Sequence, residues 1–236
     1  MEPPTPHPDR SSDAFIRHVA HDLRASLNVV VSWGELVKGG QLPPEDLARA
    51  GDTILRHARH LSQRLSAALD LWRLDSGLLT VSTGVCSVGA TVRAAVDAAR
   101  PQFESRRVDC RLDVQGDGSA NGDEARLAQA LVVLLGDAAA NTLAEHAVDV
   151  TVADDADYLV VTIVGGGVLP DEHAFDRNPA DTRASGSTRP FDFGLSLARA
   201  LVRLNGGELG VEAAEGGRVA FVVRMPKAGA PSGPQR

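Results

Sequence analysis

The chain has 236 residues, 43% of them hydrophobic, and a formal net charge of −7. This length suits a small helical module followed by one α/β domain. An acidic balance without a basic block argues against nucleic acid and anionic membrane surfaces as partners. The two cysteines lack the spacing of a metal or redox motif, and no apolar run approaches the roughly 20 residues of a membrane span. We therefore expect a cytoplasmic protein without a signal peptide.

A long helix is predicted to follow a proline-rich N-terminus. We expect residues 1–11, and also the Pro- and Gly-rich residues 227–236, to be disordered. After Ser12, the expected N-cap, apolar residues recur every three or four positions. These residues form the expected seam of the helix: Ile16, Ala20, Leu23, Leu27, Val30 and Val37.

A second helix is predicted to run from Pro44 to about Asp75. The break at residues 39–44 contains glycine and proline, which are typical of the end of one helix and the start of the next. Between Leu47 and Trp72 the apolar residues again alternate by three and four. The two helices therefore form an antiparallel hairpin over residues 12–76, and their uncovered stripes predict that two copies pair into a dimeric four-helix bundle.

Residues 77–226 have the pattern of a second domain, in which short β-branched runs alternate with helical ones. Strands are predicted at residues 78–83, 108–114, 148–153, 158–164, 207–213 and 218–225. Helices are predicted near residues 87–104, 123–145 and 194–205. This alternation favours an α/β sandwich, a mixed sheet with helices on one face, so the whole chain is predicted to be α+β. Residues 169–193 have neither period and are expected to form a mobile loop.

His21 is the residue of most chemical interest in the first helix. It follows Ala20 of the seam by about 100° of helical rotation, which places it at the edge of the bundle, open to water. An accessible imidazole is a usable nucleophile near neutral pH, and the adjacent Asp22 can accept or orient its proton. A lone His-Asp pair is nevertheless more often just a solvated helix face.

The surroundings of His21 resemble the phosphoacceptor box of histidine kinases of two-component systems. The matching residues are Phe15, His21, Asp22, Leu23, Arg24, Leu27 and Asn28. The resemblance continues in order through residues 69–77, 122–135, 194–211 and 218–226. It implies a GHKL-type ATPase-like second domain, an enzyme of the protein-histidine phosphotransferase or kinase class, and a response-regulator receiver as partner.

The resemblance also implies roles for single residues. His21 would take the phosphoryl group on a ring nitrogen and exchange it with a receiver aspartate, with Asp22 as the acid/base neighbour. The family usually has Thr or Asn where this chain has Ala25, so phosphatase activity toward the partner is not expected. An acidic receiver surface fits a polar and basic cluster on the hairpin. The predicted docking residues are Arg17, Arg24, Asn28 and Arg56.

The nucleotide positions depart further from the family. Its N-box asparagines correspond to Val133 and Asp137, and its basic residue corresponds to Ala140. Its first glycine box contains an aspartate that binds adenine, whereas residues 164–168 of this chain contain no acidic residue. Only Asp137 remains as a hard oxygen ligand for Mg²⁺. The remaining positions of a weak or vestigial ATP site are Asp137, Asn141, Gly165, Gly167, Gly194 and Leu195.

Three interpretations stay open. The residues favour a phosphorelay protein that receives its phosphate from a partner, such as an upstream kinase, and binds no cofactor. The family favours a sensor-less autokinase that uses Mg-ATP. The third interpretation is a non-catalytic scaffold dimer. A Zn²⁺ site at His18, His21, His57 and His60 is disfavoured, because arginines crowd the same helix faces.

Overall fold

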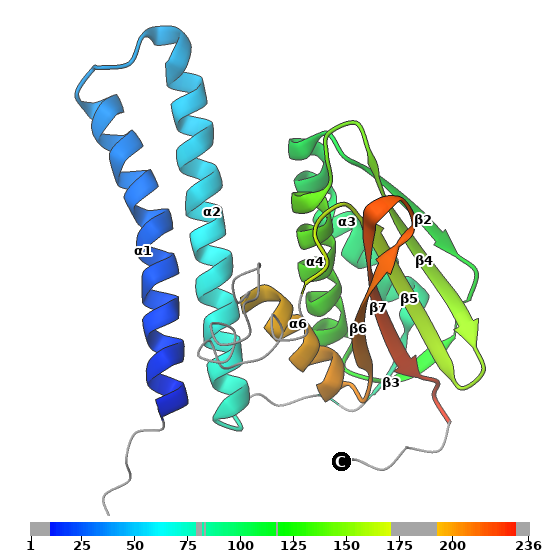
Figure 1. Ribbon diagram of the computed structural model, residues 1–236. Helices are drawn as coiled ribbons and strands as arrows, with labels where there is room; N and C mark the ends of the chain where they lie inside the picture. Colours follow the sequence, from blue (N-terminus) through cyan, green and yellow to red (C-terminus); the bar gives the residue numbers. More distant parts are fainter. Residues whose placement is uncertain (1–9, 79–81, 83, 117, 171–192, 230–236) are drawn as a thin grey trace, which may run out of the picture.

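The computed structural model describes residues 10–78, 82, 84–116, 118–170 and 193–229, without the side chains of residues 10–19, 21, 22, 25, 26, 60 and 75. It consists of a long helical hairpin beside an α/β domain (Figure 1). The elements are α1 (Arg10–Lys38), α2 (Pro44–Asp75), β1 (Gly84–Ser87), α3 (Val88–Arg106), β2 (Asp109–Val114), β3 (Ser119–Gly122), α4 (Glu124–Asn141), β4 (Ala147–Asp155), β5 (Tyr158–Gly165), α6 (Phe193–Leu204), β6 (Glu208–Ala214), the 3₁₀ turn η2 (Glu215–Gly217) and β7 (Arg218–Pro226).

The predicted antiparallel hairpin of α1 and α2 is confirmed. α1 begins at Arg10, two residues before the expected N-cap Ser12. α2 begins with Pro44 in its first turn, where a missing N–H costs nothing, followed by two acidic residues that favour the positive end of the helix. Large apolar side chains stay exposed along the hairpin: Leu27, Val31, Val37, Leu47, Leu55, Leu65, Leu69 and Trp72. None of the described helices has the length and apolar content that a bilayer crossing requires.

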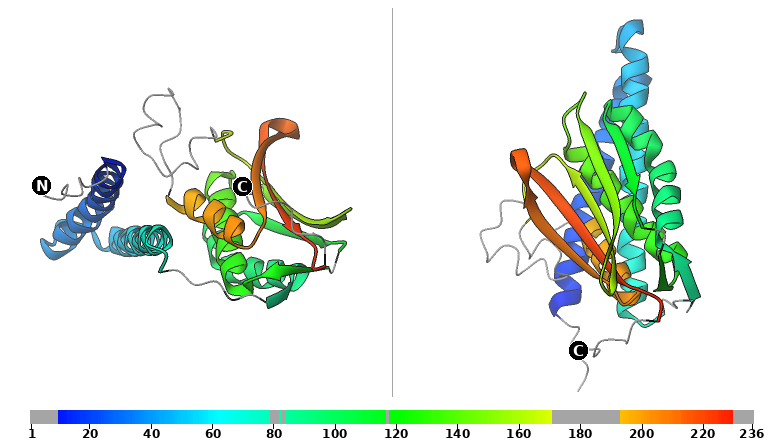
Figure 2. Two further views of the ribbon diagram at one scale, coloured as in Figure 1. Left: turned by 90° about the horizontal axis from the view of Figure 1, so that it is seen from below. Right: turned by 90° about the vertical axis from the view of Figure 1, so that its right-hand side faces the viewer.

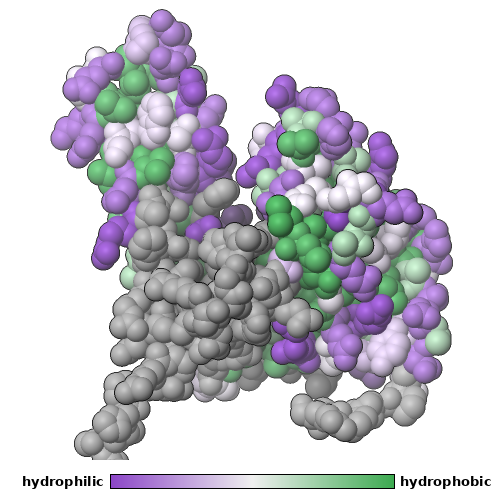
Figure 3. All heavy atoms as spheres, in the orientation of Figure 1, coloured by the Kyte–Doolittle hydropathy of each residue, from purple (hydrophilic) through white to green (hydrophobic). Residues whose placement is uncertain are grey.

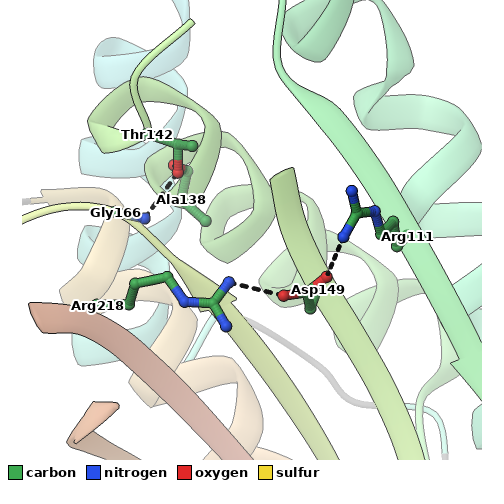
Figure 4. A network of polar contacts seen from close by, with 6 residues as sticks. All are labelled: Arg111, Ala138, Thr142, Asp149, Gly166 and Arg218. Atoms are coloured by element: carbon green, nitrogen blue, oxygen red, sulfur yellow. Dashed lines mark hydrogen bonds and ion pairs between the residues drawn. The ribbon is translucent and has the colours of Figure 1, made fainter. Parts of the chain in front are cut away.

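The second domain is built on a five-stranded sheet of order β2-β4-β5-β7-β6. The β2–β4 pair is parallel and the other pairs are antiparallel, so the sheet is mixed, as predicted. Helices α3, α4 and α6 cover one face of it (Figure 2). Alternate residues of β4 and β5 are buried against these helices, whereas Asp149 on the other face of β4 pairs with Arg111 of β2 and with Arg218 of β7 (Figure 4).

The strand expected at residues 78–83 falls mainly on residues 79–81 and 83, which lie outside the described part of the chain; the first described strand, β1, begins at Gly84. Two other expectations about this domain need correction. The short strand β3, which pairs with β1, had no β-branched signal in its sequence SANG. α4 ends at Asn141 rather than near 145, because Thr142 leaves the helical conformation. Most of the expected mobile loop, residues 171–192, also lies outside the description.

The C-terminal segment keeps backbone contacts beyond β7. Lys227 forms a bridge with Ala120, and the Ala228 N–H donates to the Ser119 carbonyl at 2.7 Å. These two residues belong to the range expected to be disordered, but β3 and the Asp157 carbonyl, to which the Lys227 N–H donates, provide them with backbone partners. Residues 230–236 lie outside the described residues.

Asp123, the N-cap of α4, joins three parts of the chain. Its carboxylate accepts hydrogen bonds from the Ser82 N–H at 3.0 Å, the Ser82 hydroxyl at 2.9 Å and the Arg126 N–H at 3.1 Å. Its own N–H donates to the buried Asn205 side chain, which in turn donates to the Leu201 carbonyl of α6. The segment that leaves α2, the start of α4 and the end of α6 are therefore held together at one residue, the first two through its carboxylate and the third through its backbone N–H.

Replacing Asp123→Ala removes this acceptor, so we expect the free energy of unfolding at pH 7 to fall by about 2 kcal/mol. Hydrogen bonds from the Ser82 and Arg126 N–H groups hold the pKa of Asp123 below its usual value, and burial opposes them. The carboxylate therefore stabilises the fold above about pH 4, and this contribution is lost as the pH falls through the lower folded-state pKa. Urea unfolding of wild type and of the Asp123→Ala variant at a series of pH values measures this contribution.

The control for this experiment is Asp97→Ala, which removes an exposed carboxylate paired with Arg100 on the same helix. We expect that variant to change the free energy of unfolding by less than about 0.5 kcal/mol. If the difference between wild type and Asp123→Ala stayed constant down to strongly acid pH, the role assigned to the carboxylate would be wrong.

Candidate functional site

The first candidate position is the middle of α1, where His21 and Asp22 lie. Their side chains are outside the described ones, so their placement rests on the helix itself. Arg24 and Asn28 follow His21 by three and seven residues, which puts all three on one side of an α-helix. Arg24 and Asn28 are both exposed. Helical periodicity therefore assigns position 21 to the side of α1 that carries the exposed Arg24 and Asn28.

The structure says less about the other two predicted docking residues, Arg56 and Arg17. Arg56 is exposed on α2, and its guanidinium donates to the Thr53 hydroxyl one turn earlier at 3.3 Å. Arg17 lies in α1, in the part whose side chains are not described. No group of three or more His, Cys, Asp or Glu among the described residues is arranged to hold a metal ion. Of the four histidines of the zinc alternative, the description includes the side chain of His57 alone.

The second candidate position is the face of α4 that corresponds to the nucleotide-binding helix of the family. Val133 and Asp137 are half-buried one turn apart, and Val133 packs against the hydrophobic core. Ala140 and Asn141 are exposed at the end of the helix. The Asn141 amide donates back to the Asp137 carbonyl at 2.8 Å, so one of its donor hydrogens is used within α4.

The glycine segment after β5 closes against the end of α4. The Gly166 N–H donates to the Thr142 hydroxyl at 2.8 Å, and this hydroxyl donates to the Ala138 carbonyl at 2.7 Å (Figure 4). A Cβ atom on Gly166 would lie 2.7 Å from the Asn141 carbonyl oxygen, and one on Gly165 would lie 3.0 Å from the Thr142 hydroxyl oxygen. Backbone packing against the end of α4 therefore requires glycine at position 166 and leaves little space for a side chain at position 165.

Apolar side chains surround this contact. Leu143, Val168 and Leu169 are 73%, 69% and 45% exposed. Apolar residues also gather on the face of the second domain that Figure 3 shows. An exposed apolar surface is a poor environment for a triphosphate, which requires N–H donors and cations.

The start of α6 carries the last two candidates, Gly194 and Leu195. Leu195 is fully buried in the hydrophobic core, so its side chain serves packing. Ser196, which replaces a glycine of the family pattern, is 2% exposed. Its hydroxyl has no hydrogen-bond partner in the described part of the chain.

Comparisons with known proteins identify both parts of the chain. Residues 11–77 match the family model described as His Kinase A (phospho-acceptor) domain. Residues 122–229 match the model described as Histidine kinase-, DNA gyrase B-, and HSP90-like ATPase. The chain belongs to the histidine-kinase family of two-component signalling proteins. Its second domain has the GHKL-like fold that the sequence predicts.

Relatives within the family are distant. Histidine protein kinase DivJ of Caulobacter vibrioides is 26% identical over 90% of this chain and 37% of its own length. Sensor protein SrrB of Staphylococcus aureus is 22% identical over 93% of this chain and 39% of its own. The chain thus spans well under half the length of these curated relatives.

Two solved structures show the same fold. The histidine kinase AdeS of Acinetobacter baumannii superposes with a TM-score of 0.64 and 16% identity, over 87% of this chain and 97% of its own. The histidine kinase ThkA, solved in complex with response regulator protein TrrA, superposes with a TM-score of 0.66 and 17% identity, over 90% of this chain and 61% of its own.

Several residues at the family's nucleotide positions differ from the family pattern. Val133 and Ala140 offer no polar side-chain atom, residues 164–168 offer no carboxylate for adenine, and the Gly166 N–H is already bonded to Thr142. The sequence pattern did not single out Thr142. Its signal was a β-branched hydroxyl residue directly after the helical period, a position from which such a side chain bonds to the last turn.

Replacing Thr142→Val keeps the shape of the side chain and removes its hydroxyl. We expect the free energy of unfolding to fall by about 1.5 kcal/mol, because the Gly166 N–H loses its partner. Thr142→Ser should restore most of the loss in urea unfolding. The matched control is Thr53→Val on α2, whose hydroxyl donates to the Arg49 carbonyl on an exposed helix face. Equal effects of both valine substitutions would contradict a structural role for the Thr142 hydroxyl.

Proposed function

We propose that the chain is a phosphorelay protein that carries a phosphoryl group on His21 and exchanges it with a response-regulator aspartate without binding ATP. Family membership supports the phosphohistidine chemistry. The observation that supports the absence of nucleotide binding is the hydrogen bond from the Gly166 N–H to Thr142, together with the apolar Val133 and Ala140 at two of the family's nucleotide positions on α4. The family's domain is kept as a scaffold, while its nucleotide contacts are replaced.

In the proposed reaction, a ring nitrogen of His21 attacks the phosphorus of an aspartyl phosphate on the receiver. The P–N bond forms as the P–O bond to the aspartate breaks, and the receiver carboxylate leaves. Asp22 takes up the proton that the phosphorylated ring releases, and it returns the proton when the transfer runs in reverse. Ala25 has no hydrogen-bonding group to position water, so we expect no phosphatase activity toward the receiver.

We assign residues 12–76 to the phosphotransfer hairpin and residues 77–226 to the ATPase-like domain. The exposed apolar stripe of the hairpin supports a homodimeric four-helix bundle, since Leu65, Leu69 and Trp72 alone are each 45% exposed or more. We further propose that the protein acts in the cytoplasm, where receiver proteins are found, and that an upstream kinase is a second partner. The proposed receiver-docking residues are Arg17, Arg24, Asn28 and Arg56.

Radiolabel transfer tests the proposal. Purified receiver domains labelled with acetyl [³²P]phosphate should transfer label to the chain, whereas [γ-³²P]ATP alone should transfer none. His21→Gln should abolish labelling, because the replacement has no nucleophilic ring nitrogen. The matched control is His146→Gln, an exposed histidine of the second domain, which should label like wild type. Label from ATP alone would support the autokinase instead, and label from neither source would support a scaffold dimer.

A nucleotide-dependent melting shift tests ATP binding by itself. We expect 1 mM Mg-ATP to leave the melting temperature unchanged, with the same concentration of ATP and EDTA as the ionic-strength control. A dissociation constant near 1 μM would raise the apparent stability by about 4 kcal/mol, which is a shift of several degrees. A shift of that size would show that the glycine segment opens to admit nucleotide.

The autokinase remains the second candidate function, because the ATPase family model covers residues 122–229. Under this alternative Mg²⁺ would bind at Asp137, whose carboxylate is a hard oxygen ligand. The nucleotide would then use the remaining family positions, namely Asn141, Gly165, Gly167, Gly194 and Leu195.

A further inference from the structure

The second domain is attached to the helical hairpin through an apolar contact on α2. Leu71 is 1% exposed, Ala67 is 8% exposed and Ala68 is 6% exposed. All three belong to the same hydrophobic cluster as the buried residues of α4, α6 and the sheet. The lower part of α2 runs beside α6 in Figure 1. The hairpin thus shares its core with the second domain at this level.

A chain of polar side chains crosses the same boundary. The Gln129 amide of α4 donates to one Asp70 oxygen of α2 at 2.7 Å. Arg73 donates to the other Asp70 oxygen at 3.2 Å, and Arg126 donates to the Gln129 carbonyl oxygen at 3.1 Å. The Asp70 side chain is 13% exposed, so water screens this contact only in part. Gln129 precedes Val133 by one helical turn, so the face of α4 that would hold a nucleotide contacts α2.

The linker between the two parts provides a third attachment. Ser82 follows α2 by seven residues and binds the Asp123 carboxylate through both its N–H and its hydroxyl. Asp123 is itself bonded to Asn205 at the end of α6. A domain held only by its linker can swing freely. Contacts on α2 and on the linker together restrain both its position and its rotation.

We propose that these three attachments form a latch, defined by Leu71, the Asp70–Gln129 bond and the Ser82–Asp123 bonds. The latch keeps the second domain stationary on α2 while phosphate moves at His21. This inference rests on the proposed function. A domain that delivers phosphate from ATP has to travel to the histidine, whereas a domain that binds no nucleotide has no cargo to deliver. Asp70 and Gln129 are positioning residues in this arrangement.

Electron paramagnetic resonance distances between two spin labels test whether the domain is stationary. The labels are placed at Lys38→Cys on the hairpin and Ser105→Cys on α3, both exposed, in a Cys110→Ser background. Labelled protein is diluted with unlabelled protein so that each dimer carries one labelled copy. We expect one narrow distance distribution, unchanged by 1 mM Mg-ATP. A broad distribution, or a change on adding Mg-ATP, would overturn the latch.

Variants at the latch give a graded response. Leu71→Asp should broaden the distribution, with circular dichroism to confirm folding. Asp70→Ala combined with Gln129→Ala leaves the apolar contact in place and should raise the undocked fraction by about tenfold. The single variant Asp70→Asn keeps an oxygen acceptor for the Gln129 amide, so its distance distribution should stay as narrow as that of wild type. The matched control is Asp97→Ala, on the outer surface of α3. Narrow distributions in every variant would mean that these residues do not hold the domain.

A cross-link separates the latch from the proposed function. Asp70→Cys and Gln129→Cys are joined by a short bismaleimide, and transfer of label from phosphorylated receiver domains to His21 is measured. We expect transfer within twofold of the uncross-linked protein. Loss of transfer only on cross-linking would show that the domain must move, which overturns the latch. Absence of transfer in wild type as well would overturn the phosphorelay, while the spin-label distances decide the latch separately.

Discussion

Two long helices cannot bury all of their own apolar surface, and the rest of the structure depends on this constraint. Each helix of the hairpin covers one stripe of the other, and α2 still has two apolar faces left. One face, with Leu71, is buried in the core of the second domain. The other, with Leu65 and Trp72, is exposed in the single chain and is suited to a second copy. The proposed dimer contact and the contact with the second domain would therefore use different sides of one helix.

The second domain keeps the fold of its family, although several of the family's nucleotide positions carry other residues. Leucines of α4 and alternate residues of β4 and β5 form its core, and none of them has to contact a nucleotide. The nucleotide positions lie at the margin of this core, where substitutions such as Val133 are tolerated. There the Thr142 hydroxyl satisfies a backbone N–H of the glycine segment. Glycine is kept for close backbone packing, which is a different reason from phosphate binding.

Much of the fold was predictable because its periodicities are strong. Alternating burial in β4 and β5, and the seams of the long helices, follow directly from side-chain geometry. The misses have local causes. β3 has the sequence SANG and is a strand only because β1 pairs with it, and α4 ends early because Thr142 caps its last turn. Neither feature produces a periodic pattern of apolar residues, so neither could be predicted from the sequence.

The sequence by itself predicted the phosphoacceptor position, and it determined the family and the apolar residues, such as Val133 and Ala140, at the family's nucleotide positions. These conclusions depend on residue identity and order along one chain, and local helix geometry is enough to place His21 beside Arg24 and Asn28. Only the tertiary structure decided that Gln129 contacts Asp70, that Ser82 binds Asp123, and that Thr142 bonds to Gly166. These pairs lie 59, 41 and 24 residues apart, and such contacts form only after the sheet and helices have packed.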